Sequence, residues 1–232
     1  MGLVSSKSVL DAANEGRYAI GAFNVNNLEF AKAVIGAATE ERSPIIVQVS
    51  ESAIAYAGMK QITGIVAGLA GQANVPVALH LDHGRDWATI VQCIANGFTS
   101  VMIDGSHLPF DENVAITRKV VDVAHAAGVS VEAELGKLAG IEDYVVVDER
   151  DAFLTDPDEA IAFVEKTGVD ALAVAIGTSH GPRKFKGEPV LAIDLVSKIK
   201  AKVGIPLVLH GASGVPAEIM EVGERFGAAW GG

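Results

Sequence analysis

Three histidines, each followed by a glycine, are the residues of this sequence best suited to chemistry. His83, His180 and His210 lie just past three separate short apolar runs. Three neutral imidazoles leave a fourth position open on zinc, which is typical of a catalytic rather than a structural site. Asp104 and Glu134 end two further apolar runs, where they could orient those ligands or hold a second metal ion. The pattern predicts a metal centre.

Polar residues also end the remaining apolar runs. Asn24 and Ser50 follow the first two runs, and Asp82 follows the third run, directly before His83. His80 and Asp82 are two residues apart and therefore face the same side of a strand, so we expect His80 to support a metal ligand rather than to be one. Packing alone does not explain so many polar strand ends, and their joint occurrence predicts an active site.

A glycine-rich segment after the last histidine is a candidate anion site. Gly211, Ala212 and Ser213 would let backbone N–H groups approach a bound phosphate closely, although an ordinary turn would explain the glycines as well. The basic residues nearest to His180 in sequence are Arg183, Lys184 and Lys186.

Short apolar runs alternate with longer amphipathic stretches along the chain. The expected strands are Ala19–Phe23, Ile45–Val49, Val77–Leu81, Ser100–Ile103, Ser130–Glu134, Leu172–Ala175 and Leu207–Leu209. The expected helices are Leu28–Glu41, Gln61–Gln72, Trp87–Asn96, Glu112–Ala127, Pro157–Thr167, Ile193–Lys202 and Ala217–Glu224. His125 falls inside an outer helix and is interpreted as structural, whereas His107 lies in a loop without an assigned role.

Seven strand–helix alternations imply parallel strands with right-handed crossovers. A closed barrel and an open doubly wound sheet both fit this rhythm. No glycine-rich phosphate loop follows an early strand, as a nucleotide-binding sheet would require. The polar strand ends favour a barrel, in which chemistry is carried by the carboxyl ends of the strands. Residues 1–232 are expected to form a single α/β barrel domain.

Composition and net charge argue against several classes of binding partner. The 232 residues carry a net charge of −11, which argues against nucleic acid and anionic membranes as partners. Cys93 is the single cysteine, so no internal disulfide can form. No secretion signal and no apolar stretch long enough to span a bilayer is evident, so a cytoplasmic enzyme is expected.

Several longer segments resemble one enzyme family, the class II fructose-1,6-bisphosphate aldolases, including the tagatose-bisphosphate branch. The similarity extends from about residue 3 to about residue 220. The matching segments are Gly21–Asn27, His80–Gly84, Gly97–Asp104, Val131–Gly136, Gly177–Gly181 and Leu209–Gly214. The resemblance implies a (β/α)8 TIM barrel and a lyase of carbohydrate metabolism that acts on a phosphorylated sugar.

The resemblance also implies roles for individual residues. His83, His180 and His210 match the ligands of the catalytic zinc, and Asp104 and Glu134 match a neighbouring second metal site. A monovalent cation is a further cofactor that the resemblance allows. The remaining matches are Asp82 and Glu142 as acid/base groups, and Asn24, Ser50, Gly181, Lys184, Gly211, Ala212 and Ser213 as substrate contacts.

Three departures from the family pattern affect these expectations. Ile141 precedes Glu142 where two glutamates are common, and Arg183 stands where a tyrosine is common. The sequence ends at Gly232 without the family's next strand and C-terminal helices, so the barrel is expected to lack its eighth strand.

The sequence alone does not exclude three alternatives to a fructose-bisphosphate aldolase. They are a tagatose-bisphosphate aldolase, a zinc hydrolase that activates water, and a catalytically impaired zinc-binding barrel fragment. No lysine ends an expected strand, which argues against an imine mechanism. The full-length form is expected to be a homodimer or homotetramer.

Overall fold

The computed structural model describes most of the chain. The backbone is described for residues 2–136, 139–142, 145–147, 154–180, 191–212, 215 and 228–231. Side chains are described for residues 2–136, 154–178, 191–212 and 215.

The helices and strands follow one another in the alternation that the sequence predicts. The helices are α1 (Ser6–Gly16), α2 (Leu28–Glu40), α3 (Glu51–Ala57), α4 (Met59–Ala70), α5 (Trp87–Ala95), α6 (Phe110–Ala126), α7 (Pro157–Thr167) and α8 (Ile193–Val203). The strands are β1 (Gly21–Asn24), β2 (Ile45–Ser50), β3 (Val77–Gly84), β4 (Ser100–Ile103), β5 (Ser130–Leu135), β6 (Ala139–Glu142), β7 (Val145–Val147), β8 (Ala171–Val174), β9 (Ser179–His180), β10 (Leu207–Leu209) and β11 (Ala228–Gly231).

Local signals in the sequence explain where several helices begin and end. The side chains of Asn27, Asp86 and Asp156 accept hydrogen bonds from the first free backbone N–H groups of α2, α5 and α7. Pro157 occupies the first turn of α7, where its missing N–H costs nothing. Gly168 ends that helix in the left-handed conformation that glycine adopts without strain.

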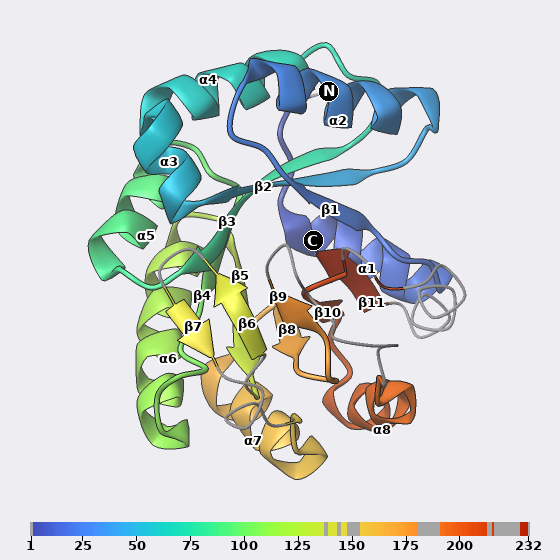
Figure 1. Cartoon of the computed structure of the whole chain (residues 1–232), viewed down its shortest axis with the longest axis vertical. Coiled ribbons are helices and arrows are strands. Elements are labelled where there is room, and N and C mark those ends of the chain that lie inside the picture. Colours follow the sequence, from blue (N-terminus) through green and yellow to red (C-terminus); the bar gives the residue numbers. More distant parts are fainter. Residues whose placement is uncertain are drawn as a thin grey trace.

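The main sheet is a closed barrel of parallel strands in the order β1-β11-β10-β8-β5-β4-β3-β2. Figure 1 shows the helices α2 to α8 arranged around the outside of these strands. All seven strands expected from the sequence are present, with boundaries within a few residues of those expected. The prediction of an α/β barrel is therefore confirmed.

The expectation that the eighth strand is missing is wrong. Residues Ala228–Gly231 form the short parallel strand β11, which pairs with both β10 and β1. Its register places Trp230 opposite Gly21 on one side and Leu209 on the other. Alanine and glycine gave no strand signal, but the free edges of β1 and β10 supply the hydrogen-bond partners that this segment lacks by itself.

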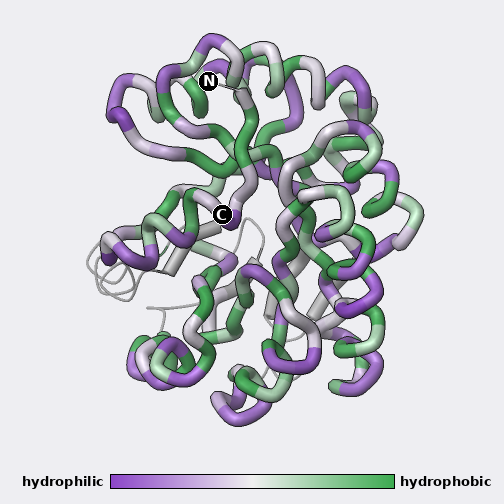
Figure 2. The backbone as a smooth tube through the Cα atoms, turned by 180° about the vertical axis from the view of Figure 1, so that it is seen from behind, coloured by the Kyte–Doolittle hydropathy of each residue, from purple (hydrophilic) through white to green (hydrophobic). Residues whose placement is uncertain are grey.

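The apolar core is divided by the barrel wall. The larger cluster lies between the strands and the outer helices, and the smaller one fills the barrel interior and its N-terminal end. Helix α1 closes that end with Val9, Leu10 and Ala13. In Figure 2 the outer helices alternate between hydrophilic and hydrophobic residues along their length, as helices with one buried face do.

A second, smaller sheet lies beside the barrel. Strand β6 pairs antiparallel with β7 and parallel with β9. These strands, together with α1 and α3, were not expected from the sequence, and the expected helix Ala217–Glu224 lies outside the described residues. Among the described helices none is by itself long and apolar enough to cross a membrane. The helices α3 and α4, which meet at a 95° bend, reach that length and composition only when they are counted together.

Candidate active site

The polar strand ends predicted from the sequence meet at the carboxyl end of the barrel. Parallel pairing of β1 to β5 and β10 around one axis brings these ends to the same rim. His83, Asp82, Asp104, Glu134 and His210 are all at least nine-tenths buried there. Buried charged groups persist only where they are paired or bind an ion, so this cluster needs such an explanation.

His83 and His210 face each other at the centre of this rim. His83 Nε2 lies 3.1 Å from His210 Nδ1, and the two ring planes are inclined at 61°. The register between β3 and β4 shifts between Leu81 and Gly84, and His83 within this irregularity has a φ of 45°. A histidine in this left-handed region is strained, and such strain concentrates at functional sites.

The ring nitrogens that face away from this pair are bound by carboxylates. His210 Nε2 lies 2.8 Å from Glu132 Oε1. His83 Nδ1 lies 3.4 Å from Asp104 Oδ2 and 3.5 Å from Glu134 Oε2. Histidines that ligate metals usually donate their other N–H to a carboxylate in this way. The arrangement leaves His83 Nε2 and His210 Nδ1 as the nitrogens available to one metal ion.

The spacing of these two nitrogens fits zinc. Two nitrogens bound to one tetrahedral zinc at the usual distance of about 2.0–2.1 Å lie about 3.4 Å apart. The observed separation of His83 Nε2 and His210 Nδ1 is 3.1 Å, so a small movement of either ring is sufficient. Asp82, His83 and His210 together place ligand atoms within 4.8 Å of one another, and so do His83, Asp104 and Glu134.

Two side-chain amides fix Asp82 beside the histidine pair. Its Oδ2 accepts a hydrogen bond from Asn24 Nδ2 at 2.6 Å, and its Oδ1 accepts one from Gln48 Nε2 at 3.0 Å. Asp82 Oδ1 also lies 3.9 Å from His83 Nε2. Asn24 was a predicted site residue, whereas Gln48 was missed because its position inside β2 gave no strand-end signal. The two amides can orient Asp82 as a base without being metal ligands.

Asp104 forms an ion pair with Arg85, a residue to which the sequence analysis gave no role. Arg85 donates to Asp104 Oδ2 from Nε at 3.0 Å and from Nη2 at 2.7 Å. Ser106 donates to the other oxygen from its backbone N–H and its hydroxyl. Burial raises the pKa of Asp104, but the hydrogen bond from His83 and the positive charges of His83 and Arg85 hold it well below its ordinary value. Asp104 is therefore a carboxylate.

Glu132 and His80 extend the site into the barrel. The hydrogen bond with His210 and the nearby histidine charges outweigh the effect of burial and lower the pKa of Glu132. Burial lowers the pKa of His210, as does the charge of His83, but the contact with Glu132 outweighs both and the pKa is raised. Sequence reasoning gave Glu132 no role, although its alternation with Glu134 along one strand face was a usable signal.

Other predicted residues lie partly or wholly outside the described structure. The backbone of His180 forms β9 and pairs with Gly140 of β6, so Glu142 comes two residues after the His180 pairing position. Gly211 and Ala212 follow His210 and are buried. Gly181, Lys184 and Ser213 lie outside the described residues, as do the cations Arg183 and Lys186.

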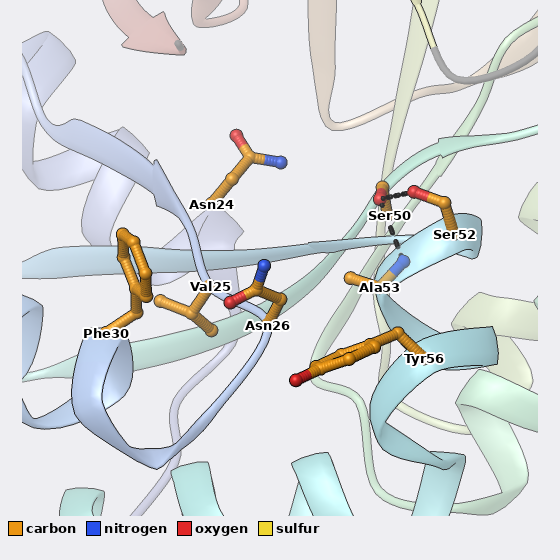
Figure 3. Close-up of a pocket in the computed structure, with 8 residues that line it drawn as sticks. All are labelled: Asn24, Val25, Asn26, Phe30, Ser50, Ser52, Ala53 and Tyr56. Carbon is orange, nitrogen blue, oxygen red and sulfur yellow. Dashed lines mark hydrogen bonds between the residues drawn. The ribbon is translucent and has the colours of Figure 1, made fainter.

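A polar pocket adjoins this cluster. It has a volume of about 280 Å³ and lies between the loop after β1 and the start of α3. Figure 3 shows Asn24, Asn26 and Phe30 on one side of it and Ser50 and Tyr56 on the other. Asn24, which lines the pocket, also donates to Asp82, so the pocket lies next to the buried cluster. Two of the predicted substrate contacts, Asn24 and Ser50, therefore line one cavity.

Comparisons with known proteins agree with this geometry. The family model described as "Fructose-bisphosphate aldolase class-II" matches residues 4–229. Fructose-bisphosphate aldolase of Thermus caldophilus is 52% identical over 229 residues, covering 99% of this chain and 74% of that protein. Its counterpart in Geobacillus stearothermophilus is 52% identical over 221 residues, covering 94% and 76%. The crystal structure of the YdjI aldolase from Escherichia coli K12 has a TM-score of 0.84 and 36% identity, covering 98% of this chain and 79% of that one.

Proposed function

Because this chain belongs to the class II fructose-bisphosphate aldolase family, a family of lyases, we propose that it cleaves fructose 1,6-bisphosphate reversibly into dihydroxyacetone phosphate and glyceraldehyde 3-phosphate. The observation that supports this most directly is the facing pair of His83 Nε2 and His210 Nδ1. Each ring has a carboxylate on its far nitrogen, as a zinc-binding histidine requires.

The proposed metal ligands are His83, His210 and His180, with zinc as the cofactor. Bound zinc would act as a Lewis acid toward the substrate carbonyl and stabilise the negative charge that develops when the carbon–carbon bond breaks. His83 and His210 come from different strands, and their far-side carboxylates hold the rings in place. His180 is assigned from the family resemblance, and its segment is adjacent to β6.

Asp82 is the proposed base of the cleavage step. It takes the proton from the C4 hydroxyl as the C3–C4 bond breaks, and Glu142 supplies a proton to C3 of the departing dihydroxyacetone phosphate. The amides of Asn24 and Gln48 support this role, because they fix both Asp82 oxygens through hydrogen bonds that persist in the carboxylate form. Glu142 is assigned from the resemblance.

We assign Asp104 and Glu134 to orienting His83 rather than to a second metal ion. A neutral imidazole has one lone pair for a metal, and His83 Nε2 is directed at His210. His83 Nδ1 then carries the proton and faces both carboxylates. The guanidinium of Arg85, 2.7 Å from Asp104 Oδ2, already supplies the positive charge that a second cation would bring.

The polar pocket is the proposed place for part of the phosphorylated sugar. Ser50 and Ser52 present hydroxyl groups 2.9 Å apart, and Asn24 and Asn26 present amides across from them. Hydroxyl and amide groups bind sugar hydroxyls and phosphate oxygens without adding charge. The other proposed phosphate contacts are Gly181, Lys184, Gly211, Ala212 and Ser213.

The proposal is tested by following triose-phosphate formation from fructose 1,6-bisphosphate in a coupled assay. Activity should disappear after removal of metal with a chelator and return with stoichiometric zinc. Parallel assays with tagatose 1,6-bisphosphate decide the sugar preference, and ester substrates test for a zinc hydrolase. Inactivity of the zinc-loaded protein toward both bisphosphates would refute the proposed reaction.

Two histidine variants provide a matched pair for the metal site. His83→Ala should lose stoichiometric zinc, because it removes one of the proposed ligands. His125→Ala should retain zinc, since His125 Nε2 pairs with Asp170 Oδ2 at 2.8 Å on the outer layer. Elemental analysis of the purified proteins separates the two outcomes, and full zinc retention in His83→Ala would contradict the ligand assignment.

A further inference from the structure

A continuous line of polar side chains joins the closed end of the barrel to His210. Its members, which we call the floor chain, are Ser6, Ser100, Ser130, His80 and Glu132. All five are at least nine-tenths buried. The sequence predicted a supporting role beside a metal ligand for His80 and no role for the other four, and the proposed reaction makes no direct use of them.

Three serines from three different elements form the lower part of the floor chain. Ser6 Oγ, at the start of α1, lies 2.7 Å from Ser100 Oγ of β4 and 2.8 Å from Ser130 Oγ of β5. Ser130 also donates to the backbone carbonyl of Thr99 at 3.1 Å. Helix α1 is therefore attached to the barrel by hydrogen bonds as well as by the apolar contacts of Val9 and Leu10.

The upper part of the floor chain leads to the proposed metal site. His80 Nδ1 lies 2.7 Å from Ser100 Oγ. On the other side of the ring, His80 Nε2 lies 3.7 Å from Glu132 Oε2, which is a close approach but not a hydrogen bond. Glu132 Oε1 lies 2.8 Å from His210 Nε2. Each member from Ser6 to His210 thus contacts the next.

A purely structural role explains His80 and Glu132 poorly. They lie inside the barrel, whose other inward-facing residues include Ala22, Met102 and Val208. Barrel interiors are usually filled by branched apolar side chains, and buried ionisable groups without a function are costly. Apolar residues could fill the same space without the need for hydrogen-bond partners, so the polar line points to a use at its upper end.

The direction of each hydrogen bond follows from Glu132. For His210 to present a lone pair at Nδ1, its Nε2 must carry the proton and donate it to Glu132. A lone pair on His80 Nε2 would repel the other Glu132 oxygen, so that nitrogen carries the proton of His80. His80 Nδ1 must then accept the hydroxyl proton of Ser100, which in turn accepts the hydroxyl proton of Ser6. Ser6 has no second proton, so it accepts from Ser130, whose hydroxyl proton is shared between Ser6 and the Thr99 carbonyl.

We propose that Ser100 and Ser6 are positioning residues of the metal centre. They select the His80 tautomer with its proton on Nε2, so that an N–H group rather than a lone pair faces the Glu132 carboxylate. Glu132 in turn holds His210 with Nδ1 directed at His83. The inference rests on the proposed function in that it takes His210 as a metal ligand. The closed end of the barrel thereby contributes to the geometry of the opposite, functional end.

The first test is Ser100→Ala, which removes the hydroxyl that donates to His80. In metal-free protein, nitrogen-15 NMR of the histidine side chains should show His80 as a mixture of tautomers and His210 with a reduced Nε2–H population. The zinc dissociation constant should rise about three- to tenfold, less than the ~10–100-fold expected for losing the direct partner of a ligand. The absorption spectrum of the cobalt-substituted protein should also shift.

Three further variants separate positioning from general stability. Ser6→Ala should change the same NMR signals to a smaller extent, and Ser100→Thr, which retains the hydroxyl, should behave like the unaltered protein. Thr167→Val is the matched control: its buried hydroxyl donates to the Phe163 carbonyl at 2.7 Å, remote from the floor chain. It should lower stability without changing the histidine signals or the zinc dissociation constant.

Unchanged histidine tautomers and zinc affinity in folded Ser100→Ala and Ser6→Ala would overturn the proposal. If Ser100→Ala does not fold, the nearly isosteric Ser100→Cys, with its weaker donor, is judged by the same criteria. The NMR measurement uses metal-free protein and no substrate. A failure of zinc binding or aldol cleavage in the unaltered protein would therefore refute the proposed function and still leave the tautomer prediction to be decided on its own.

Discussion

Replacing Gly84 with alanine should damage both the barrel and the metal site. A Cβ at this position would lie 2.6 Å from the backbone oxygen of Met102, 2.7 Å from Leu81 Cδ2 and 3.0 Å from Ile90 Cγ1. The Met102 oxygen belongs to β4 and cannot rotate away as a side chain can. The strands β3 and β4 must therefore separate locally.

The expected size of the effect follows from overpacking and from the position of His83. Forcing one methyl group into a close-packed core costs about 1–3 kcal/mol of the free energy of unfolding. The Gly84 carbonyl accepts a hydrogen bond from Asp104 N at 2.9 Å, so the displacement also moves His83 and Asp104 relative to each other. We expect the zinc dissociation constant to rise about tenfold, as for loss of a carboxylate partner.

Urea denaturation and zinc titration measure the two effects separately. Gly68→Ala in α4 is the matched control, because a Cβ there meets no atom within 4 Å and the position is helical. It should raise the free energy of unfolding by about 0.5–1 kcal/mol and leave zinc binding unchanged. A Gly84→Ala protein with unaltered stability and zinc affinity would show that the packing argument around β3 is wrong.

Three further predictions concern single residues of the site and the core. Asp82→Asn should retain zinc but lose about 10²–10⁴-fold in kcat for bisphosphate cleavage, and near-normal turnover would remove Asp82 from the mechanism. Arg85→Met should permit a second divalent cation beside Asp104, seen as a metal stoichiometry above the single ion expected for the unaltered chain; two ions in the unaltered chain would contradict this assignment. Burial raises the pKa of the Cys93 thiol to about 12, so iodoacetamide at pH 8 should modify it only after unfolding, and rapid labelling of the native protein would refute its inaccessibility.

Several barrel strands were predictable because they are buried on both faces and therefore read as short apolar runs. Ala171–Val174 and Leu207–Leu209 are examples, in which every residue is apolar and buried. The polar rim was predictable for the related reason that parallel strands end at the same edge. His83 and His210 were brought together as expected, although they lie 127 residues apart in the sequence.

The missed features depend on contacts that sequence periodicity does not record. Helix α3 has no buried residue, so it lacks an apolar stripe that a pattern search could detect. Arg85 acquires its role through Asp104, which is 19 residues away and on another strand. Glu132 and Ser6 likewise acquire their contacts only when the barrel closes around them. Strand β11 forms because β1 and β10 on either side of it supply its backbone hydrogen-bond partners.

The pairing of β11 with β1 has a consequence for how the protein folds. It brings Gly21 next to Trp230, so the barrel closes only when the two ends of the sequence meet. Contacts between distant segments carry the largest loop-closure entropy and slow folding. Pairs formed by consecutive strands, such as β2 with β3, close shorter loops and therefore lose less loop-closure entropy. They also extend over more residues. We therefore expect the β1–β11 contact to form last, and its amide hydrogens to exchange with solvent sooner than those of β2 and β3.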